Sequence, residues 1–250
     1  MKKLILGCSL LALFSACDPK MLEQIQKQAG GLAKSTNIPL SNDEVIKGLR
    51  SALSVGTDSS VSILGRTNGF FSDALIKLAL PNEAQPIVNN LSKIPGGQKL
   101  VNDAILAINR AAEDAAPQAK TIFINAISKI TIQDGFSILN GGNSAATTYL
   151  KNNTYQQLTD AFAPRIRTSL SKPIVLGYSA EKAYQQLIDA YNLASIGGSL
   201  WTPIKQNSLA TYTTQKALDG LFLKVSQEEA KIRQDPFHRV TDILKRVFGK

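Results

Sequence analysis

Apolar residues recur every three or four positions along most of the chain from residue 41 onward, which is the spacing of one face of a helix. The clearest helix start is Ser41, because Glu44 follows three residues later and completes a capping box. An apolar stripe comes directly after it, made of Val45, Ile46, Leu49, Ala52 and Leu53. The pattern therefore predicts an amphipathic helix that begins at Ser41.

The same spacing predicts further helices along the chain. Two stripes carry the prediction: Val101, Ala104, Ile105 and Ile108, then Ile122, Phe123, Ala126, Ile127 and Ile130. Helix starts are expected at Pro117, at Thr131, at Thr154 with Gln157, and at Ser179, whose helix should run through Tyr191. Gly141-Gly142 should end the segment that Thr131 begins.

Strand signals are sparse. Residues Ile76 to Leu80 alternate apolar side chains with Lys77, as a short strand would, but no other run of this kind is available to pair with them. Gly-Gly pairs at residues 30, 96, 141 and 197 have unlike neighbours, so we interpret them as independent helix stops rather than as repeats. The fold class predicted is all-α, with a single multi-helix domain.

The first residues have the composition of an export signal. Lys2 and Lys3 precede an apolar run from Leu4 to Leu13, and small residues follow. That run is too short to cross a bilayer, which takes about 20 residues, and Asp18-Pro19 prevents a helix from continuing. The expected organisation is a signal peptide over 1–16, a tether over 17–37 that includes Gly30-Gly31, and a helical domain over 38–250.

Phe14-Ser15-Ala16-Cys17 at the end of this signal resembles the bacterial lipobox, although leucine is commoner than Phe14 at its position. The resemblance implies that Cys17 receives a diacylglycerol and an N-terminal acyl chain such as palmitate. Cys8 would be lost with the signal, so Cys17 would be the only thiol and would have no partner for an internal disulfide. The alternative is a plain signal peptide cut near Ala16. We expect an exported, lipid-anchored protein of the cell envelope, on its periplasmic face or at the cell surface.

Composition narrows the chemistry. With 250 residues, of which 44% are hydrophobic, the chain can bury a substantial core, and its net charge of +9 favours anionic partners only moderately. His238 is the only histidine, which excludes a metal site of several imidazoles and a histidine-centred triad within one chain. No cofactor is expected. Nucleic acid is not an expected partner, because export separates the protein from it and no recognition motif is present.

Three weak chemical motifs each have a simpler explanation. Ser169 with Lys172 and Ser179 with Lys182 have the spacing of a lysine-activated serine, but Ser179 also fits a helix cap. Gly96-Gly97-Gln98-Lys99 has the composition of an anion site at a helix start, and turn-forming glycine explains it as well. Carboxylates that would suit a cation are more often partners in solvated ion pairs: Glu113, Asp114, Glu228 and Glu229.

Two pairs of opposite charge lie one helical turn apart, Arg110 with Glu113 and Lys216 with Asp219. Side chains at this spacing are neighbours on a helix surface and can also reach across to another helix. We interpret both as structural ion pairs in preference to parts of a ligand site, because charge pairs along helix faces are common.

The C-terminal segment predicts one more amphipathic helix. Its apolar face consists of Val240, Ile243, Leu244, Val247 and Phe248, and its surrounding cations are Arg239, Lys245, Arg246 and Lys250. Two interpretations remain open: the helix lies on an anionic membrane, or its apolar face packs into the domain. The pattern favours packing.

Several blocks make the chain similar to a known family: Glu44–Leu53, Asn109–Lys120, Thr214–Phe222 and Leu244–Gly249. They resemble the bacterial family called domain of unknown function 4197, and the resemblance departs around Ile196 to Gln206. It implies an exported, predominantly helical protein and no particular activity. The function expected is a non-enzymatic binding or scaffolding domain with an envelope protein as partner. Alternatives are an envelope enzyme and a carrier of an apolar ligand in a cavity lined by Ile105, Ile108, Phe123 and Phe222.

Overall fold

The computed structural model describes residues 41–91, 95–175, 178–194, 198, 203, 208–239 and 242–248, which belong to one compact unit that begins at Leu40. Its α-helices are α2 (Asn42–Leu64), α3 (Gln85–Leu91), α4 (Gly97–Ala115), α5 (Ala119–Ser128), α6 (Ile132–Asn140), α7 (Ala145–Leu170), α8 (Ala180–Ala194), α9 (Leu209–Gln234) and α10 (Asp242–Phe248). Short 3-10 helices are η1 (Asn82–Ala84), η2 (Ala116–Gln118) and η3 (Pro236–His238). The all-α prediction is confirmed.

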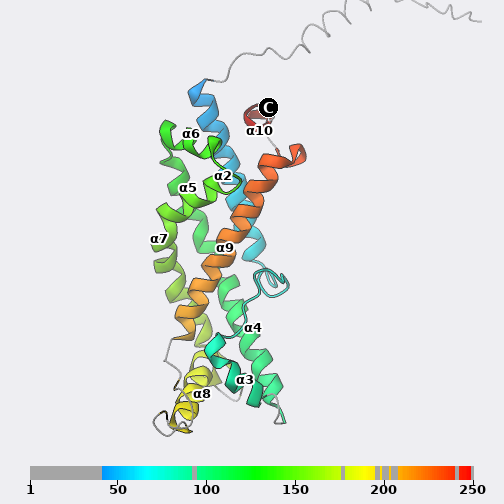
Figure 1. Cartoon of the computed structure of the whole chain (residues 1–250), viewed down its shortest axis with the longest axis vertical. Coiled ribbons are helices and arrows are strands. Elements are labelled where there is room, and N and C mark those ends of the chain that lie inside the picture. Colours follow the sequence, from blue (N-terminus) through cyan, green and yellow to red (C-terminus); the bar gives the residue numbers. More distant parts are fainter. Residues whose placement is uncertain are drawn as a thin grey trace, which may run out of the picture. The chain divides into compact units, whose positions relative to one another are not determined.

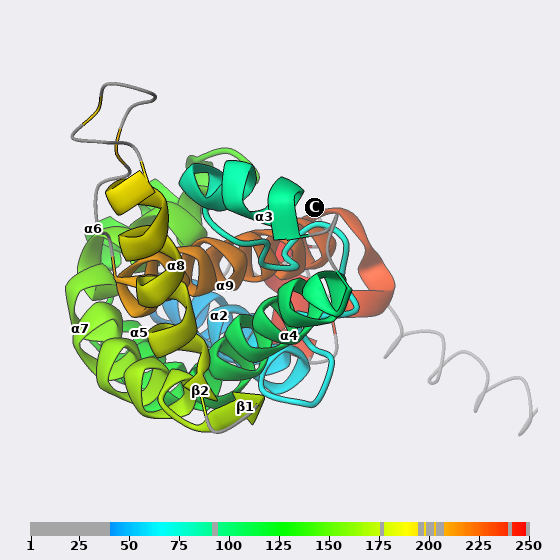
Figure 2. The same ribbon diagram turned by 90° about the horizontal axis from the view of Figure 1, so that it is seen from below.

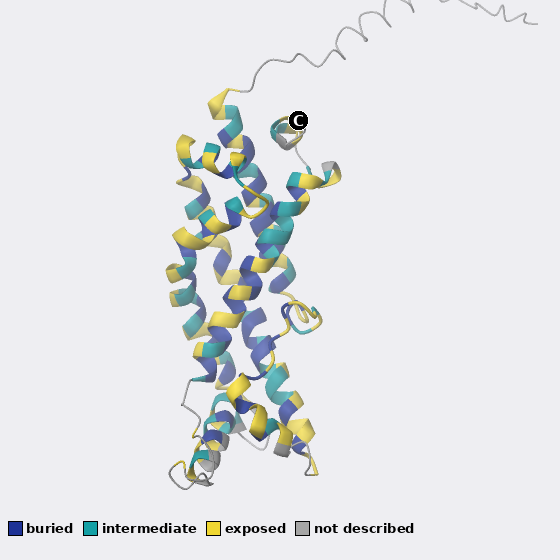
Figure 3. Cartoon of the chain, viewed as in Figure 1, coloured by how far each residue is buried: buried dark blue, intermediate teal, exposed yellow. Residues whose placement is uncertain are grey.

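Helix α9 packs against both α2 and α7, and α4 and α5 pack against α7 (Figures 1 and 2). Their facing sides carry the apolar stripes, as the dark rows in Figure 3 show. Fully buried side chains from four of these helices meet there: Leu49, Ile108, Leu158, Phe162, Leu218 and Leu221. One core therefore joins segments from all parts of the described chain.

Local capping signals mark the helix starts as predicted. The Ser41 hydroxyl accepts from the Glu44 N–H at 3.3 Å, and the Glu44 carboxylate accepts from the Ser41 N–H at 3.0 Å. Thr131 and Asp134 repeat the arrangement at α6, and the hydrogen bond from the Thr131 N–H lowers the pKa of Asp134. Ser179 accepts from the Lys182 N–H at 3.2 Å at the start of α8.

The predicted helix start at Thr154 is wrong. Helix α7 runs without a break from Ala145 to Leu170, and Thr154 lies buried in its middle, where its hydroxyl donates to the Leu150 carbonyl at 2.6 Å. Threonine tolerates an interior position by bonding one turn back in this way. The true start has no local side-chain cap at Ser144, so no signal marked it in the sequence.

Two extended pieces interrupt the helices. The strands β1 (Pro173–Val175) and β2 (Tyr178–Ser179) form an antiparallel hairpin that the pattern did not predict, and β1 lies against α4 (Figure 2). The alternating segment Ile76 to Leu80 is not part of a described sheet, although Ile76, Leu78 and Leu80 are buried while Lys77 and Ala79 are exposed. Among the described helices, none is both long enough and apolar enough to span a membrane.

Candidate functional site

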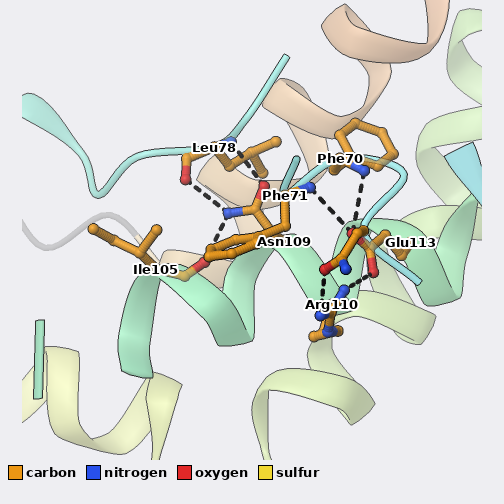
Figure 4. A network of polar contacts seen from close by, with 8 residues as sticks. Phe70, Phe71, Leu78, Ile105, Asn109, Arg110 and Glu113 are labelled. Atoms are coloured by element: carbon orange, nitrogen blue, oxygen red, sulfur yellow. Dashed lines mark hydrogen bonds and ion pairs between the residues drawn. The ribbon is translucent and has the colours of Figure 1, made fainter. Parts of the chain in front are cut away.

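The candidate site is built around helix α4 and the loop that joins α2 to η1. Asn109 and Glu113 lie one turn apart on α4 and are both buried, and their side chains point at this loop (Figure 4). Side chains at this spacing share a helix face, so two polar groups of α4 contact successive parts of the loop. We call Asn109, Arg110 and Glu113 the α4 clamp.

Asn109 takes the place of a partner strand for the segment Ile76 to Leu80. Its amide oxygen accepts from the Leu78 N–H at 2.9 Å, and its amide nitrogen donates to the Leu78 carbonyl at 2.8 Å. The same nitrogen also donates to the Ile105 carbonyl of α4 at 2.7 Å. A side-chain amide carries one donor group and one acceptor group, as a peptide group does, so it holds this segment extended without a sheet.

Glu113 holds the turn that precedes this segment. Its Oε1 accepts from the N–H groups of Phe70 and Phe71 at 3.1 and 3.2 Å, and its Oε2 lies 2.5 Å from Nη1 of Arg110. Arg110 also donates through Nη2 to the side-chain oxygen of Asn68 at 2.7 Å. A buried carboxylate is stabilised when N–H donors and a cation satisfy its oxygens, and both kinds of partner are present here.

The turn at Asn68 and Gly69 needs these residue types. Asn68 has a φ of 68°, a left-handed value that asparagine tolerates better than most residues. A Cβ at Gly69 would clash with the carbonyl oxygens of Ile63 and Leu64 at the end of α2. The tight turn lets Phe70 enter the core, where its ring lies against Gly220 of α9 with no room for a larger residue there.

A surface groove of about 310 Å³ lies between the extended segment and α9. Leu75 and Leu223 flank it and are 70% and 40% exposed, so both offer apolar surface at the groove. The Tyr212 hydroxyl donates to the Ala79 carbonyl at 3.1 Å, and burial, followed by the nearby charge of Glu83, raises the pKa of Tyr212. We call this the edge groove, because the segment Ile76 to Leu80 forms one of its walls on the side away from Asn109.

Two cations border the loop that forms this groove. Lys77 lies 4.1 Å from the centroid of the Phe71 ring, and Lys224 of α9 lies 2.5 Å from the Asp73 carboxylate. The hydrogen bond from Lys224 lowers the pKa of Asp73. One contact lies within the loop and the other joins the loop to α9. The exposed side of the loop is therefore held by α9, as its buried side is held by α4.

A second groove, of about 500 Å³, lies between α4 and the end of α7 and contains the Ser169–Lys172 motif. The Ser169 hydroxyl donates to Asp114 at 2.5 Å, and Arg165 lies 3.3 Å from the same carboxylate. This pairing ties α7 to α4 and leaves no lysine hydrogen-bonded to the serine among the contacts of the described residues. Ser179 of the other motif caps α8. The geometry of neither serine indicates nucleophilic catalysis.

The four carboxylates considered for a cation are dispersed. Glu229 accepts from the Ala146 and Thr147 N–H groups at 3.0 and 2.8 Å and pairs with Arg233, and Glu228 pairs with Lys231. Glu113 and Asp114 have the partners given above. Within the described ranges, no group of three or more histidine, cysteine or acidic side chains is arranged to hold a metal ion.

Sequence reasoning missed two long-range caps. Glu229 caps the start of α7, and Glu181 of α8 accepts from the N–H groups of Leu209 and Ala210 at 3.2 and 2.9 Å at the start of α9. A carboxylate at a helix N-terminus satisfies open N–H groups and meets the positive end of the helix dipole. Serine stands at the N-cap position of both helices, Ser144 and Ser208, so the sequence does not indicate that a distant carboxylate supplies the cap.

The C-terminal helix packs against α2. A Cβ on Gly48 would lie 2.5 Å from Val247 Cγ2 and 3.2 Å from Ile243 Cγ1, so glycine allows α10 to approach closely. Arg246 pairs with Glu44 at 2.9 Å, Lys245 lies 3.6 Å from Asp242, and Arg239 donates to the carbonyls of Ile232 and Arg233. The side chain of Phe248 is outside the described residues, as are Cys17 and most of the segment from Ile196 to Gln206.

Lys216 and Asp219 lie 3.7 Å apart on α9, with both side chains more than half exposed.

The residues expected to line a ligand cavity pack against other side chains of the core. Ile108 and Phe123 are fully buried, and the rings of Phe123 and Phe222 meet edge to face with centroids 6.1 Å apart. Between α2, α7 and α9 the described core leaves a void of only about 20 Å³. That is room for about one water molecule.

The region of the chain that forms this architecture matches a known protein family. Residues 39–249 match the family described as Protein of unknown function (DUF4197). The chain belongs to this family. The match confirms the resemblance inferred from the sequence blocks, and the DUF4197 region covers the α4 clamp, both grooves and α10. No curated protein and no solved structure matches the chain.

Proposed function

We propose that this protein is a lipid-anchored component of the bacterial cell envelope whose DUF4197 domain is a non-enzymatic binding module. In this proposal Cys17 carries the lipid, and the domain binds an extended segment of an envelope protein in the edge groove. The anchor is supported by the sequence around Cys17 alone. The binding role is supported by one structural observation on the outer edge of the segment Ile76 to Leu80. There the Lys77 N–H donates to the Asp73 carbonyl and the Ala79 carbonyl accepts from Tyr212, but the Ala79 N–H and the Lys77 carbonyl have no partner among the described residues.

The outer edge of this segment offers main-chain groups to a partner. Asn109 occupies both groups of Leu78 on the inner side, and side chains alternate between core and solvent. In a strand the N–H and C=O groups of neighbouring residues face opposite edges, so the groups of Lys77 and Ala79 face away from Asn109. Among the described residues, no contact occupies the Ala79 N–H or the Lys77 carbonyl.

An extended peptide would complete this edge. A single peptide residue can accept from the Ala79 N–H and donate to the Lys77 carbonyl, as in strand addition to a sheet. Exposed Leu75 and Leu223 flank the same groove and would contact apolar side chains of that peptide. The α4 clamp holds the segment extended beforehand, which lowers the entropy lost on binding.

For the alternative of an apolar-ligand carrier, the described residues of α2, α7 and α9 enclose no space of ligand size. Its four lining residues pack against other side chains, and the interhelical void is the size of one water molecule. A catalytic role lacks convergent polar groups, because the buried carboxylates are engaged with main-chain N–H groups and arginines. Binding through the surface is therefore the function that these contacts favour.

Photo-cross-linking in the host tests the binding role. Benzoylphenylalanine at Leu75 should give a discrete adduct, and the same probe at Leu193, which is 84% exposed on α8, should not. Ala79→Pro removes the free N–H and should abolish the adduct, whereas Ala79→Val keeps the N–H and should retain it. An adduct that survives Ala79→Pro, or that forms equally at Leu193, would contradict strand addition.

The anchor has a separate test. The mature protein isolated from its host should begin at Cys17 and carry the mass of a diacylglycerol and an acyl chain. Cys17→Ala protein should move from the membrane to the soluble fraction, because one residue supplies all of the acyl chains. A mature chain without added fatty acid would exclude the anchor and leave the edge groove unaffected.

A further inference from the structure

The most exposed large apolar side chain of the described residues is Phe237, in η3 between α9 and α10. Its exposed fraction is 93%, whereas other phenylalanines such as Phe70, Phe123 and Phe162 are fully buried. Moving an aromatic ring of this size from water into an apolar environment is favourable by about 2 kcal/mol, so Phe237 is a side chain that could insert into one.

Local hydrogen bonds hold this ring outward. The Phe237 N–H donates to Asp235 Oδ1 at 2.9 Å, and the His238 ring lies 2.8 Å from Asp235 Oδ2. The guanidinium of Arg239 donates back to the carbonyls of Ile232 and Arg233 at 3.1 and 2.9 Å. The turn is fixed on both sides of Phe237, which keeps the side chain from folding back onto α9.

This turn lies at the end of the unit where the tether joins. Figure 1 shows η3 and α10 beside the first turns of α2, with α8 at the opposite end, and the Arg246–Glu44 pair joins α10 to the first turn of α2. Between Cys17 and Ser41 the sequence has 23 residues. A chain of that length reaches about 80 Å at most. The end of the unit that carries η3 is therefore the end directly connected in sequence to Cys17, within that reach of any surface to which Cys17 is attached.

We propose that Phe237 inserts into the membrane surface beside the lipid anchor and orients the domain on the bilayer. This inference rests on the proposed anchor at Cys17. The apolar face of α10 is not proposed as the membrane contact, because Ile243 and Val247 of that face pack against Gly48 of α2.

The contact is apolar rather than electrostatic. Most cations around the turn have an acidic partner: Arg246 has Glu44, Lys245 has Asp242, and Lys231 has Glu228. Among the described residues next to Phe237, only Arg239 has main-chain carbonyls in place of an acidic partner, so we expect the contact not to require anionic lipid. A single ring binds weakly by itself, but attachment of the chain to the same membrane makes its insertion intramolecular.

Spin labelling of the lipidated full-length protein tests this orientation. Because lipid would occupy the thiol of Cys17 and Cys8 would leave with the signal, Phe237→Cys provides one labelling site. The labelled protein is reconstituted in phosphatidylcholine vesicles, and the accessibility of the nitroxide to oxygen is compared with its accessibility to a water-soluble nickel chelate. Leu193→Cys on α8 is the matched control, since its side chain is also highly exposed.

At residue 237 the oxygen-to-nickel accessibility ratio should be severalfold higher than at residue 193, and adding phosphatidylglycerol should leave it unchanged. Equal ratios in vesicle-bound protein of the expected lipidated mass would overturn the orientation and leave the anchor intact. Spin–spin broadening at residue 237 would also overturn it, because it would show a second copy on this surface. An unlipidated protein that does not float with the vesicles would overturn the anchor, and this inference with it.

Discussion

Arg110 with Glu113 and Lys216 with Asp219 have the same spacing and the same charges, yet the structure uses them differently. The first pair is 2.5 Å apart, with Glu113 almost fully buried and bonded to two main-chain N–H groups of a distant loop. The second is 3.7 Å apart on the surface of α9, with both side chains more than half exposed. The difference lies in the third partner, because only Glu113 has main-chain donors that would lose their acceptor without it.

Of the substitutions that test this difference, Glu113→Ala should lower the free energy of unfolding the most. It would leave two N–H groups and a guanidinium without their acceptor, and we expect a loss of about 3 kcal/mol in the free energy of unfolding. Urea unfolding followed by far-ultraviolet circular dichroism measures this loss. If Glu113→Ala unfolds at the wild-type urea concentration, the clamp does not stabilise the fold.

Asn109→Ala should have the next largest effect. The Leu78 N–H and carbonyl would remain buried without a partner, at a cost of about 2 kcal/mol. Asn102→Ala on the exposed side of the same helix is the matched control, because it removes only a surface hydrogen bond with Gln98. Similar losses for the two variants would show that Asn109 contributes no more than a surface amide.

The effect of burial on an ionisable group can also be tested at Tyr184, through the dependence of stability on alkaline pH. Burial, followed by the nearby charges of Glu83 and Glu181, raises the pKa of Tyr184 to about 12. The unfolded chain releases this proton near pH 10 while the folded protein retains it, so the free energy of unfolding should fall as the pH rises from 10 to 12. The slope from this group is about 1.4 kcal/mol per pH unit at most.

Tyr184→Phe removes the group responsible and should flatten the fall in stability between pH 10 and 12. Urea unfolding of both proteins at several pH values measures the two slopes. Equal slopes would mean that Tyr184 ionises in the folded protein as readily as in the unfolded chain.

Asp219→Asn should have the smallest effect. Exposed ion pairs at this spacing are screened by water and salt, so the free energy of unfolding should change by less than about 0.5 kcal/mol. The same urea experiment applies. If Asp219→Asn lowered the free energy of unfolding as much as Glu113→Ala does, the main-chain partners of Glu113 would not explain the difference between the two pairs.

How much the sequence predicted depended on how far apart the interacting residues are. Capping boxes at Ser41 and Thr131 connect residues three apart, so they were visible in the sequence and are confirmed. The all-α class followed from helical periodicity in the same way. The cap of α7 by Glu229 joins residues more than 80 positions apart, and no local signal specifies such a pair.

The candidate site shows the same limit. The alternation at Ile76 to Leu80 was recognised, as was the absence of a strand to pair with it. The sequence did not reveal that Asn109, 31 residues away from Leu78, replaces that strand through its side-chain amide. An asparagine next to the stripe that ends at Ile108 was the available clue, but its partner depends on how the loop folds back over α4.

Amide hydrogen exchange at Leu78 and Ala79, resolved by nuclear magnetic resonance, tests the central claim that Asn109 holds the inner edge of this segment while the Ala79 N–H at the outer edge stays open. Leu78 should exchange far more slowly than Ala79, because only its N–H is bonded to Asn109. In Asn109→Ala the difference between these neighbours should disappear. Equal exchange rates at the two amides of the wild-type protein would contradict the account.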